Sequence, residues 1–299
     1  MFPLKDENPT HRRPIVTVAI IAACLWVYFG WQPSLGSPEP VDVDTPVGTL
    51  VFDAPTAFNF ENAAIPCEII RVRPLNVEEV ITTLESARPD AANCTAATGV
   101  PVFSDKSVWL SLLTSMFLHG SLLHLGGNLL FLWIFGNNIE DHLGHFRFVL
   151  FYLVGGLIAS AAHIGLNLES TIPVVGASGA IAAVMGAYLV WFPDAPVRTA
   201  LILFIFVSFV DIRAKWLLGF WFVSQFFTNP NSGVAWAAHV GGFAFGVIVG
   251  LIIRANGSIR RATWTPDHQP RPGASWDDTG GVGYHPYAPR RMGRGGRRR

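Results

Sequence analysis

Residues 119–136 read HGSLLHLGGNLLFLWIFG, an apolar run that carries the polar side chains of His124 and Asn128. A helix that starts near Ser121 places these two side chains, four residues apart, on one face. His119 precedes His124 by five residues, about 140° around such a helix, so we expect it not to share that face. Because polar groups inside a membrane cost free energy, their presence there indicates function.

The composition predicts a membrane protein. Of 299 residues, 51% are hydrophobic and 14% are charged, whereas soluble domains carry about 25% charged residues. The 21 basic and 21 acidic residues cancel, so only their distribution is informative. Three cysteines without a CxxC pair exclude a disulfide scaffold and a structural zinc site. We expect no cofactor and no metal.

Six apolar runs predict an all-α polytopic membrane protein, because a membrane-spanning helix needs about 20 residues. The runs are Pro14–Trp31, Ser121–Gly136, Phe146–Leu166, Ser178–Phe192, Trp216–Phe227 and Val234–Ile253. The fourth run spans only ~22 Å as a helix, so one of its ends must lie below the membrane surface. Residues 200–210 are apolar too, but three charges follow them, and we expect this stretch to dip into or lie on the inner interface.

Charge asymmetry predicts the orientation. Lys5, Arg12 and Arg13 precede the first run, and residues 255–299 carry nine Arg against three Asp, a net charge of +6. Residues 32–106 carry eleven acids against four bases, a net charge of −7. The positive-inside rule then places both termini in the cytoplasm. We further expect the chain to lie in a plasma membrane. The predicted parts are an N-terminus at 1–13, a first helix at 14–31, an exported acidic loop at 32–106, a helical core at 107–253 and a disordered basic tail at 254–299.

The exported loop contains Cys67 and Cys94, whereas Cys24 lies in the first run. Outside the cytoplasm a disulfide can persist, and closing this loop would restrict the unfolded chain by roughly 3–4 kcal/mol. We expect a Cys67–Cys94 bond; two unpaired thiols are the alternative.

Four polar groups are predicted at one depth. His124 and Asn128 lie in the outer half of the second run, Ser178 opens the short fourth run, and His239 lies ~7–8 Å below the outer face in the sixth. An irregular approach at residues 172–177 is tolerated at that depth only beside a watered cavity. Small residues on the fourth and sixth runs allow the two helices to approach closely, which would bring Ser178 within hydrogen-bond reach of His239.

A serine beside a neutral imidazole is an activated nucleophile. The imidazole accepts the hydroxyl proton during attack on a carbonyl and returns it to the leaving group. His124, Asn128 and the Ser178 N–H can then donate to the oxyanion, at ~3–4 kcal/mol per donor in other enzymes. Since the fourth and sixth runs hold no carboxylate, the chemistry would run as a dyad.

Three motifs together resemble those of rhomboid intramembrane serine proteases. They are HxxxxHxxxN at 119–128, GxSG at 176–179 and AHxxGxxxG at 238–246, in that order on the second, fourth and sixth runs. The resemblance implies a six-helix rhomboid bundle, with Ser178 as nucleophile, His239 as base and an oxyanion hole of His124, Asn128 and the Ser178 amide. It also implies structural positions within the motifs: His119, Gly176, Gly179, Gly242 and Gly246.

The resemblance further implies that the chain cleaves transmembrane protein substrates, which enter from the side past the fifth run. Membrane lipids are expected neighbours, and no nucleic acid is expected. One position departs from the pattern: the aromatic ring that stacks on the catalytic histidine in bacterial members corresponds to Ala182 here. Trp236 or a phenylalanine would have to orient His239 instead.

Two other functions stay open. A catalytically silent rhomboid-like protein would bind membrane clients without cutting them. A metal-dependent enzyme or transporter would use His119, His124 and His239, but the 140° offset of the first two and the lack of a nearby carboxylate argue against it. His163 matches no motif and is interpreted as a packed or interfacial histidine.

Overall fold

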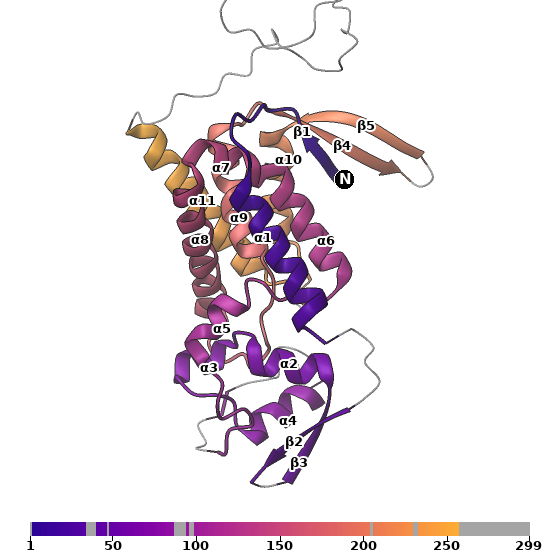
Figure 1. Ribbon diagram of the computed structural model, residues 1–299, viewed down its shortest axis with the longest axis vertical. Helices are drawn as coiled ribbons and strands as arrows, with labels where there is room; N and C mark the ends of the chain where they lie inside the picture. The colour runs from indigo at the N-terminus through magenta and orange to yellow at the C-terminus, as the bar shows by residue number, and fades with distance from the viewer. Residues whose placement is uncertain are drawn as a thin grey trace, which may run out of the picture. The chain divides into compact units, whose positions relative to one another are not determined.

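The longest apolar runs form helices in the computed structural model, which describes residues 2–33, 40–46, 48–86, 94–95, 99–203, 206–229 and 233–256. Within these described residues, three helices are long and apolar enough to cross a membrane, and two further apolar helices are shorter. The three are Leu122–Leu143, made of α6 Leu122–Phe131, the π-helical turn η3 Leu132–Gly136 and α7 Asn137–Leu143, then α8 His145–Leu166 and α11 Trp236–Ala255. The two are Ile15–Trp31, made of α1 Ile15–Trp26 and the π-helical turn η1 Val27–Trp31, and α9 Ser178–Trp191. The predicted helical polytopic membrane fold is confirmed (Figure 1).

Helix α9 is the centre of the bundle, with almost every residue from Gly179 to Trp191 buried. Its 14 residues extend only about 21 Å. Small residues set its contact with α11, because a Cβ on Gly242 would collide with the carbonyl oxygen of Gly179 and one on Gly246 with that of Ala183. The two small-residue faces therefore meet, as the sequence predicts.

The start of α1 is held by a buried carboxylate on α7. Glu140 accepts hydrogen bonds from the Val16 and Thr17 amides at 2.8 and 2.7 Å, and from the Thr17 hydroxyl at 2.7 Å. These amides belong to the first turn of α1, where no intrahelical acceptor exists. The His145 imidazole lies 2.6 Å from the same carboxylate, so one side chain joins three helices.

Within the stretch 200–210, residues 200–203 and 206–210 belong to two strands of a β-hairpin, and the position of this hairpin at the membrane interface stays a prediction. Strands β4 Pro196–Leu203 and β5 Phe206–Arg213 pair antiparallel, and β1 Phe2–Asp6 pairs with β4. Hydropathy ranks these residues as apolar, but it does not detect a pairing partner at the far end of the chain. Helix α10, Ala214–Gln225, follows β5 and has only 12 residues, or about 18 Å.

The stretch predicted as an exported loop at 32–106 contains a folded unit, which we call the disulfide domain (residues 40–106, of which 47, 87–93 and 96–98 are not described). Its elements are β2 Pro40–Thr45, β3 Gly48–Asp53, α2 Ala54–Asn62, α3 Pro66–Arg71 and α4 Val77–Glu85. Local signals explain the helices: Asp53 caps α2, and Asn76 and Glu79 form a reciprocal capping box on α4. The domain has its own apolar core, which includes Phe52, Phe60, Ile65, Leu75 and Val80. The net charge gave no sign of this core.

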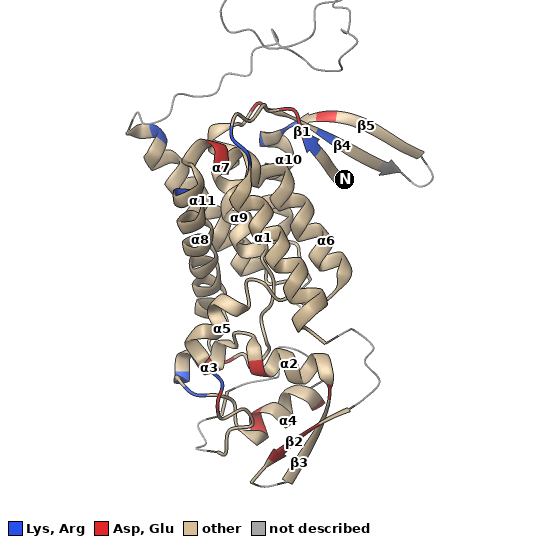
Figure 2. Cartoon of the chain, viewed as in Figure 1, with Lys and Arg blue, Asp and Glu red and all other residues tan. Residues whose placement is uncertain are grey.

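Charged residues concentrate at the ends of the described bundle, and its middle is almost free of them in Figure 2. The disulfide domain precedes α5 Val108–Thr114, which leads into the α6 end of the bundle. Within the domain, Cys67 and Cys94 form a disulfide with a Cα–Cα distance of 5.6 Å. The predicted basic tail, apart from residues 254–256, falls outside the described residues.

Candidate active site

Ser178 and His239 lie in hydrogen-bond contact. Ser178 is the first residue of α9 and His239 lies in the first turn of α11. The close approach of these helices leaves 2.8 Å between Ser178 Oγ and His239 Nε2. This is the geometry in which an imidazole nitrogen accepts a proton from a serine hydroxyl.

A glutamine that sequence analysis did not identify binds the second ring nitrogen of His239. Gln225, at the end of α10, is buried, and its Oε1 lies 2.7 Å from His239 Nδ1. The Gln225 Nε2 donates to the carbonyl of Trp221 at 3.0 Å, so Oε1 must face His239 as an acceptor. The His239 Nδ1 then carries the proton, and Nε2 is free to accept from Ser178.

The aromatic neighbour of His239 also comes from α10. The ring of Trp221 lies 5.7 Å from the His239 ring, tilted by 40°. Trp236, which the sequence suggested for this role, contacts Phe226 instead. Ala182, on α9, is fully buried and has no ring. The ring beside His239 comes from Trp221 on α10 instead. An amide in an apolar run was the available signal for Gln225, but no motif included it.

Gly176 leaves room for the His124 imidazole on the side where Ser178 Oγ also lies. Its φ of +131° is accessible to glycine and strained for other residues. A Cβ at this position would lie 2.8 Å from His124 Nε2 and 3.5 Å from Ser178 Oγ. The first glycine of the GxSG motif therefore serves both backbone conformation and space.

His124 and Asn128 project from the first turns of α6. The Ser121 hydroxyl accepts from the His124 amide at 3.1 Å and caps the helix. Asn128 is buried, and among the described residues no acceptor lies within hydrogen-bond distance of its Nδ2. A buried, unpaired N–H donor is costly in a protein that does not use it.

One cavity of about 1150 Å³ is lined by the four candidate site residues, Ser178, His239, His124 and Asn128. Its walls combine polar groups with apolar side chains such as Phe131, Met185 and Trp236. His163, interpreted from sequence as a packed or interfacial residue, also lines this cavity. The arrangement matches an apolar ligand site with a few convergent polar groups.

His119 is closer to His124 than the helical projection predicted. Helix α6 begins at Leu122, so residues 119–121 are not helical and the 140° offset does not apply. The rings of His119 and His124 lie edge to face with centroids 5.2 Å apart. His119 is buried, and its amide donates to Gln32 Oε1 at 3.0 Å, which places it as a support between α6 and the end of η1.

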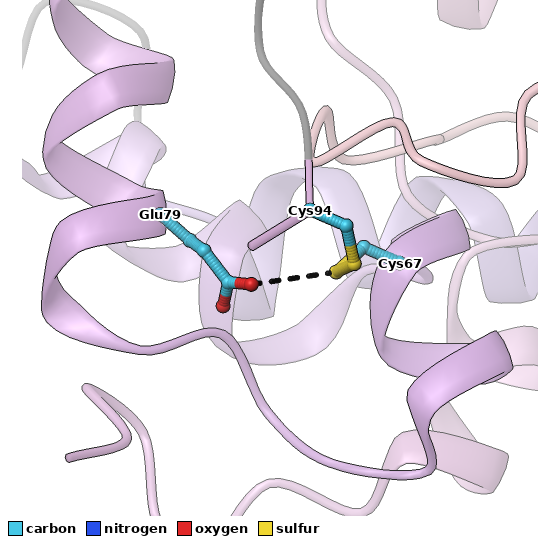
Figure 3. A group of neighbouring side chains, drawn as sticks. All are labelled: Cys67, Glu79 and Cys94. Carbon is cyan, nitrogen blue, oxygen red and sulfur yellow. Dashed lines mark hydrogen bonds between the residues drawn. A yellow bond between two sulfur atoms is a disulfide. The ribbon is translucent and has the colours of Figure 1, made fainter. Parts of the chain in front are cut away.

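Among the described residues, one group of three potential metal ligands exists, made of Cys67, Glu79 and Cys94. Figure 3 shows that the two sulfur atoms are joined to each other. A disulfide offers no thiolate to a metal, so this group does not fit a metal ion in the oxidised chain.

Comparison with known families fits this geometry. Residues 106–256 match the model of the Rhomboid domain, and this stretch contains Ser178, His239, His124 and Asn128. The chain belongs to the rhomboid family. The rhomboid domain begins just before α5 and ends with α11, so the disulfide domain lies outside it apart from its last residue.

Several rhomboid relatives are similar over parts of the chain. Rhomboid protease GluP of Bacillus subtilis is 42% identical over 81 residues, 27% of this chain and 15% of its own. RHOMBOID-like protein 6, mitochondrial, of Arabidopsis thaliana is 33% identical over 150 residues, 48% of this chain and 43% of its own. Human presenilin-associated rhomboid-like protein, mitochondrial, is 32% identical over 148 residues, 46% and 36% respectively. This chain thus spans less than half the length of these rhomboid relatives.

The predicted plasma-membrane location is contradicted by these relatives. Those matched over 148 residues or more carry the word mitochondrial in their names. The physical reason for the error is that charge asymmetry orients helices relative to a membrane but contains no information about which membrane it is.

Proposed function

We propose that this rhomboid protein is a serine endopeptidase that cleaves peptide bonds in or near transmembrane segments of other membrane proteins. The observation that carries the proposal is the 2.8 Å contact between Ser178 Oγ and His239 Nε2, with the second imidazole nitrogen held by Gln225. A helix bundle that only binds other membrane proteins does not need a hydrogen-bonded series of Ser178, His239 and Gln225 beside its cavity, and buried polar groups in a membrane are costly.

In the proposed reaction His239 Nε2 accepts the Ser178 hydroxyl proton while Oγ attacks the scissile carbonyl carbon. The C–N bond then breaks, and His239 returns the proton to the leaving amine. Water, deprotonated by the same imidazole, attacks the acyl-serine; the C–Oγ bond breaks, His239 returns the proton to Ser178 Oγ, and the acyl group leaves as the carboxylic acid. Gln225 keeps the His239 proton on Nδ1 and stabilises the imidazolium formed in each step.

The oxyanion would be stabilised by donors placed before the substrate arrives. Asn128 Nδ2 is buried and unpaired among the described residues, and the His124 imidazole and Ser178 Oγ both lie against the open side of Gly176. The Ser178 amide, at the start of α9, has no intrahelical acceptor. Fixed donors of this kind act without reorganisation during the reaction.

Membrane protein substrates suit the cavity, because its apolar wall can accept a chain leaving the lipid. The irregular segment before α11 includes Gly233, with φ +69°, and Val234 and Ala235 line the cavity. Movement of this segment together with α10 would open a lateral path.

A fluorophosphonate probe tests the proposal directly. The detergent-purified chain should become labelled on Ser178, whereas Ser178→Ala and His239→Ala should give at least about a thousandfold lower labelling rate. Equal labelling of all three proteins would contradict the assignment. Absence of labelling in a wild-type protein that still binds membrane clients would favour a catalytically silent rhomboid.

A further inference from the structure

The segment Glu169–Gly176 forms part of the wall of the active-site cavity and ends two residues before Ser178. It connects α8 to α9 and, apart from two single-residue β-bridges, has no regular structure of its own. Its position is therefore set by the groups that bind its backbone. A displacement of about 1 Å at a nucleophile can cost two orders of magnitude in rate.

The two cysteines of the disulfide bind consecutive carbonyls of this segment. The Cys67 amide donates to the Ser170 carbonyl at 2.9 Å, and the Cys94 amide donates to the Glu169 carbonyl at 2.8 Å. The Cys67–Cys94 bond fixes the spacing of the two donors. The disulfide-bonded cysteines thus bind Glu169 and Ser170, the first two residues of the segment that lines the cavity.

The disulfide domain contacts the rest of the segment as well. The Thr83 and Thr171 hydroxyls are 2.6 Å apart, and the Val174 amide donates to the Ala64 carbonyl at 2.8 Å. Ser115, which follows α5 outside the domain, links it to the end of the segment, because its hydroxyl accepts from the Ala64 amide at 2.6 Å and its carbonyl accepts from the Gly176 amide at 2.9 Å. Contacts therefore run from the first residue of the segment to the last.

A buried carboxylate fixes the surroundings of the disulfide. Glu79 Oε1 lies 3.8 Å from Cys67 Sγ (Figure 3). Arg73 donates to both Glu79 oxygens at 2.8 Å, and the Thr95 amide, next to Cys94, donates to Oε1 at 2.9 Å. Cys94 is thus tied to α4 as well as to Cys67.

From these contacts we propose that the disulfide domain is a positioning element for catalysis, in which Cys67 and Cys94 hold segment Glu169–Gly176 and, through it, Ser178. This role rests on the proposed protease function and assigns to a region outside the rhomboid domain a part in shaping its active site. It predicts that the domain contributes to rate without contacting the reacting atoms.

Hydrogen–deuterium exchange tests the positioning without requiring catalysis. In a Ser178→Ala background, the double variant Cys67→Ser/Cys94→Ser should show about tenfold faster exchange in the peptide covering residues 168–177, which contains the Val174 and Gly176 amides. Peptides from the middle of α8 and from α11 should be unchanged. Unchanged protection of residues 168–177 would overturn the proposal, and it would do so even if α4 exchanged faster in the double variant.

Labelling of Ser178 by a fluorophosphonate supplies the second readout. With Ser178 intact, the double cysteine variant should label about tenfold more slowly than wild type. If wild type is not labelled at all, the protease function fails, and exchange at residues 168–177 still decides the positioning. If wild type is labelled and the double variant matches it, the positioning role alone fails.

A milder variant covers the case in which the cysteine variant does not fold. Thr83→Val removes only the hydroxyl that meets Thr171 and leaves the disulfide in place, so it should raise exchange at residues 168–177 severalfold. Thr82→Val is the matched control, because Thr82 is the exposed neighbour on α4. Equal exchange in the two variants would contradict the proposal.

Discussion

Replacing Gln225 tests whether the orientation of the His239 imidazole matters, because the imidazole itself stays in the site. Gln225→Leu removes the Nδ1 acceptor, and loss of a buried hydrogen bond of ~1–3 kcal/mol corresponds to a roughly 5- to 150-fold slower fluorophosphonate labelling of Ser178. The ¹⁵N chemical shifts of His239 should show that the proton is no longer confined to Nδ1.

The conservative variant Gln225→Glu keeps an acceptor oxygen and should retain most of the labelling rate and the wild-type ¹⁵N pattern. A purely packing role for Gln225 would leave the tautomer unchanged in Gln225→Leu. That result would remove Gln225 from the proposed chemistry.

Asn128 is predicted to act in the transition state only. Because its Nδ2 has no partner among the described residues, Asn128→Ala loses no ground-state hydrogen bond there. It should lower kcat for a membrane substrate by about 10²–10³ while KM stays within a few fold.

Asn167→Ala is the control for Asn128→Ala. Asn167 lines the same cavity, but its Nδ2 already donates to the His163 carbonyl at 2.8 Å. A similar fall in kcat for both variants would point to a general effect on the cavity rather than to an oxyanion donor.

At the scale of elements, the contact between α9 and α11 decides whether the site exists. Gly246→Ala places a methyl group against the Ala183 carbonyl on α9, where neither backbone can move freely. We expect the variant to lose about 1–3 kcal/mol of stability or more and to label more slowly, since separating the helices separates Ser178 from His239.

Thermal unfolding in detergent measures the Gly246→Ala effect, and Gly126→Ala is its control. Gly126 is also a helical glycine, on α6, but a methyl group added there would meet no heavy atom of another element within 4 Å. The control should unfold at or slightly above the wild-type temperature, since alanine favours helix. Equal destabilisation by both changes would rule out the α9–α11 contact as the cause.

The element scale also shows what apolar patterning leaves undecided. Residues 196–213 combine β-branched and aromatic residues with charges, a composition that suits a strand as well as an interfacial segment. The pairing of β4 with β1 brings the N-terminus back to the bundle, where Asp6 accepts from the Asn138 side chain of α7 at 2.6 Å and from the Tyr188 hydroxyl of α9 at 2.8 Å. No local pattern contains that information.

At the scale of the whole molecule, the disulfide domain should lose stability in acid. Burial alone would raise the pKa of Glu79, but the Arg73 guanidinium and the Asn76 and Thr95 amides outweigh it and hold the pKa below its usual value of 4.5. A depressed carboxyl pKa contributes stability above the unfolded-state value, and this contribution is lost as the pH falls through the folded-state value.

Glu79→Gln should therefore destabilise the protein at pH 7 by ~1–3 kcal/mol, and the difference from wild type should shrink as the pH falls below the usual carboxyl pKa of 4.5 toward the lower pKa of folded Glu79. Calorimetry between pH 3 and pH 7 measures this convergence. Glu78→Gln, at the exposed neighbouring position, should follow wild type throughout. A Glu79→Gln deficit that stays constant with pH would contradict an ionic origin.

The sequence by itself determined the helical membrane fold and the candidate pair Ser178 and His239. Apolar runs of sufficient length must be helical in lipid, since only internal hydrogen bonding satisfies the backbone there. The spacing of small residues on α9 and α11 then fixed which faces meet, and this made the separation of one hydroxyl and one imidazole predictable.

Tertiary structure alone decided what surrounds that pair. Gln225 and Trp221 reach His239 from α10, His119 meets His124 through a non-helical turn, and the disulfide domain holds the segment before Ser178. Each of these contacts joins residues whose local sequence has no periodic or motif signal for the other. They arise from how whole elements pack, because a long-range contact is specified by the sum of many weak interactions and not by any one stretch of chain.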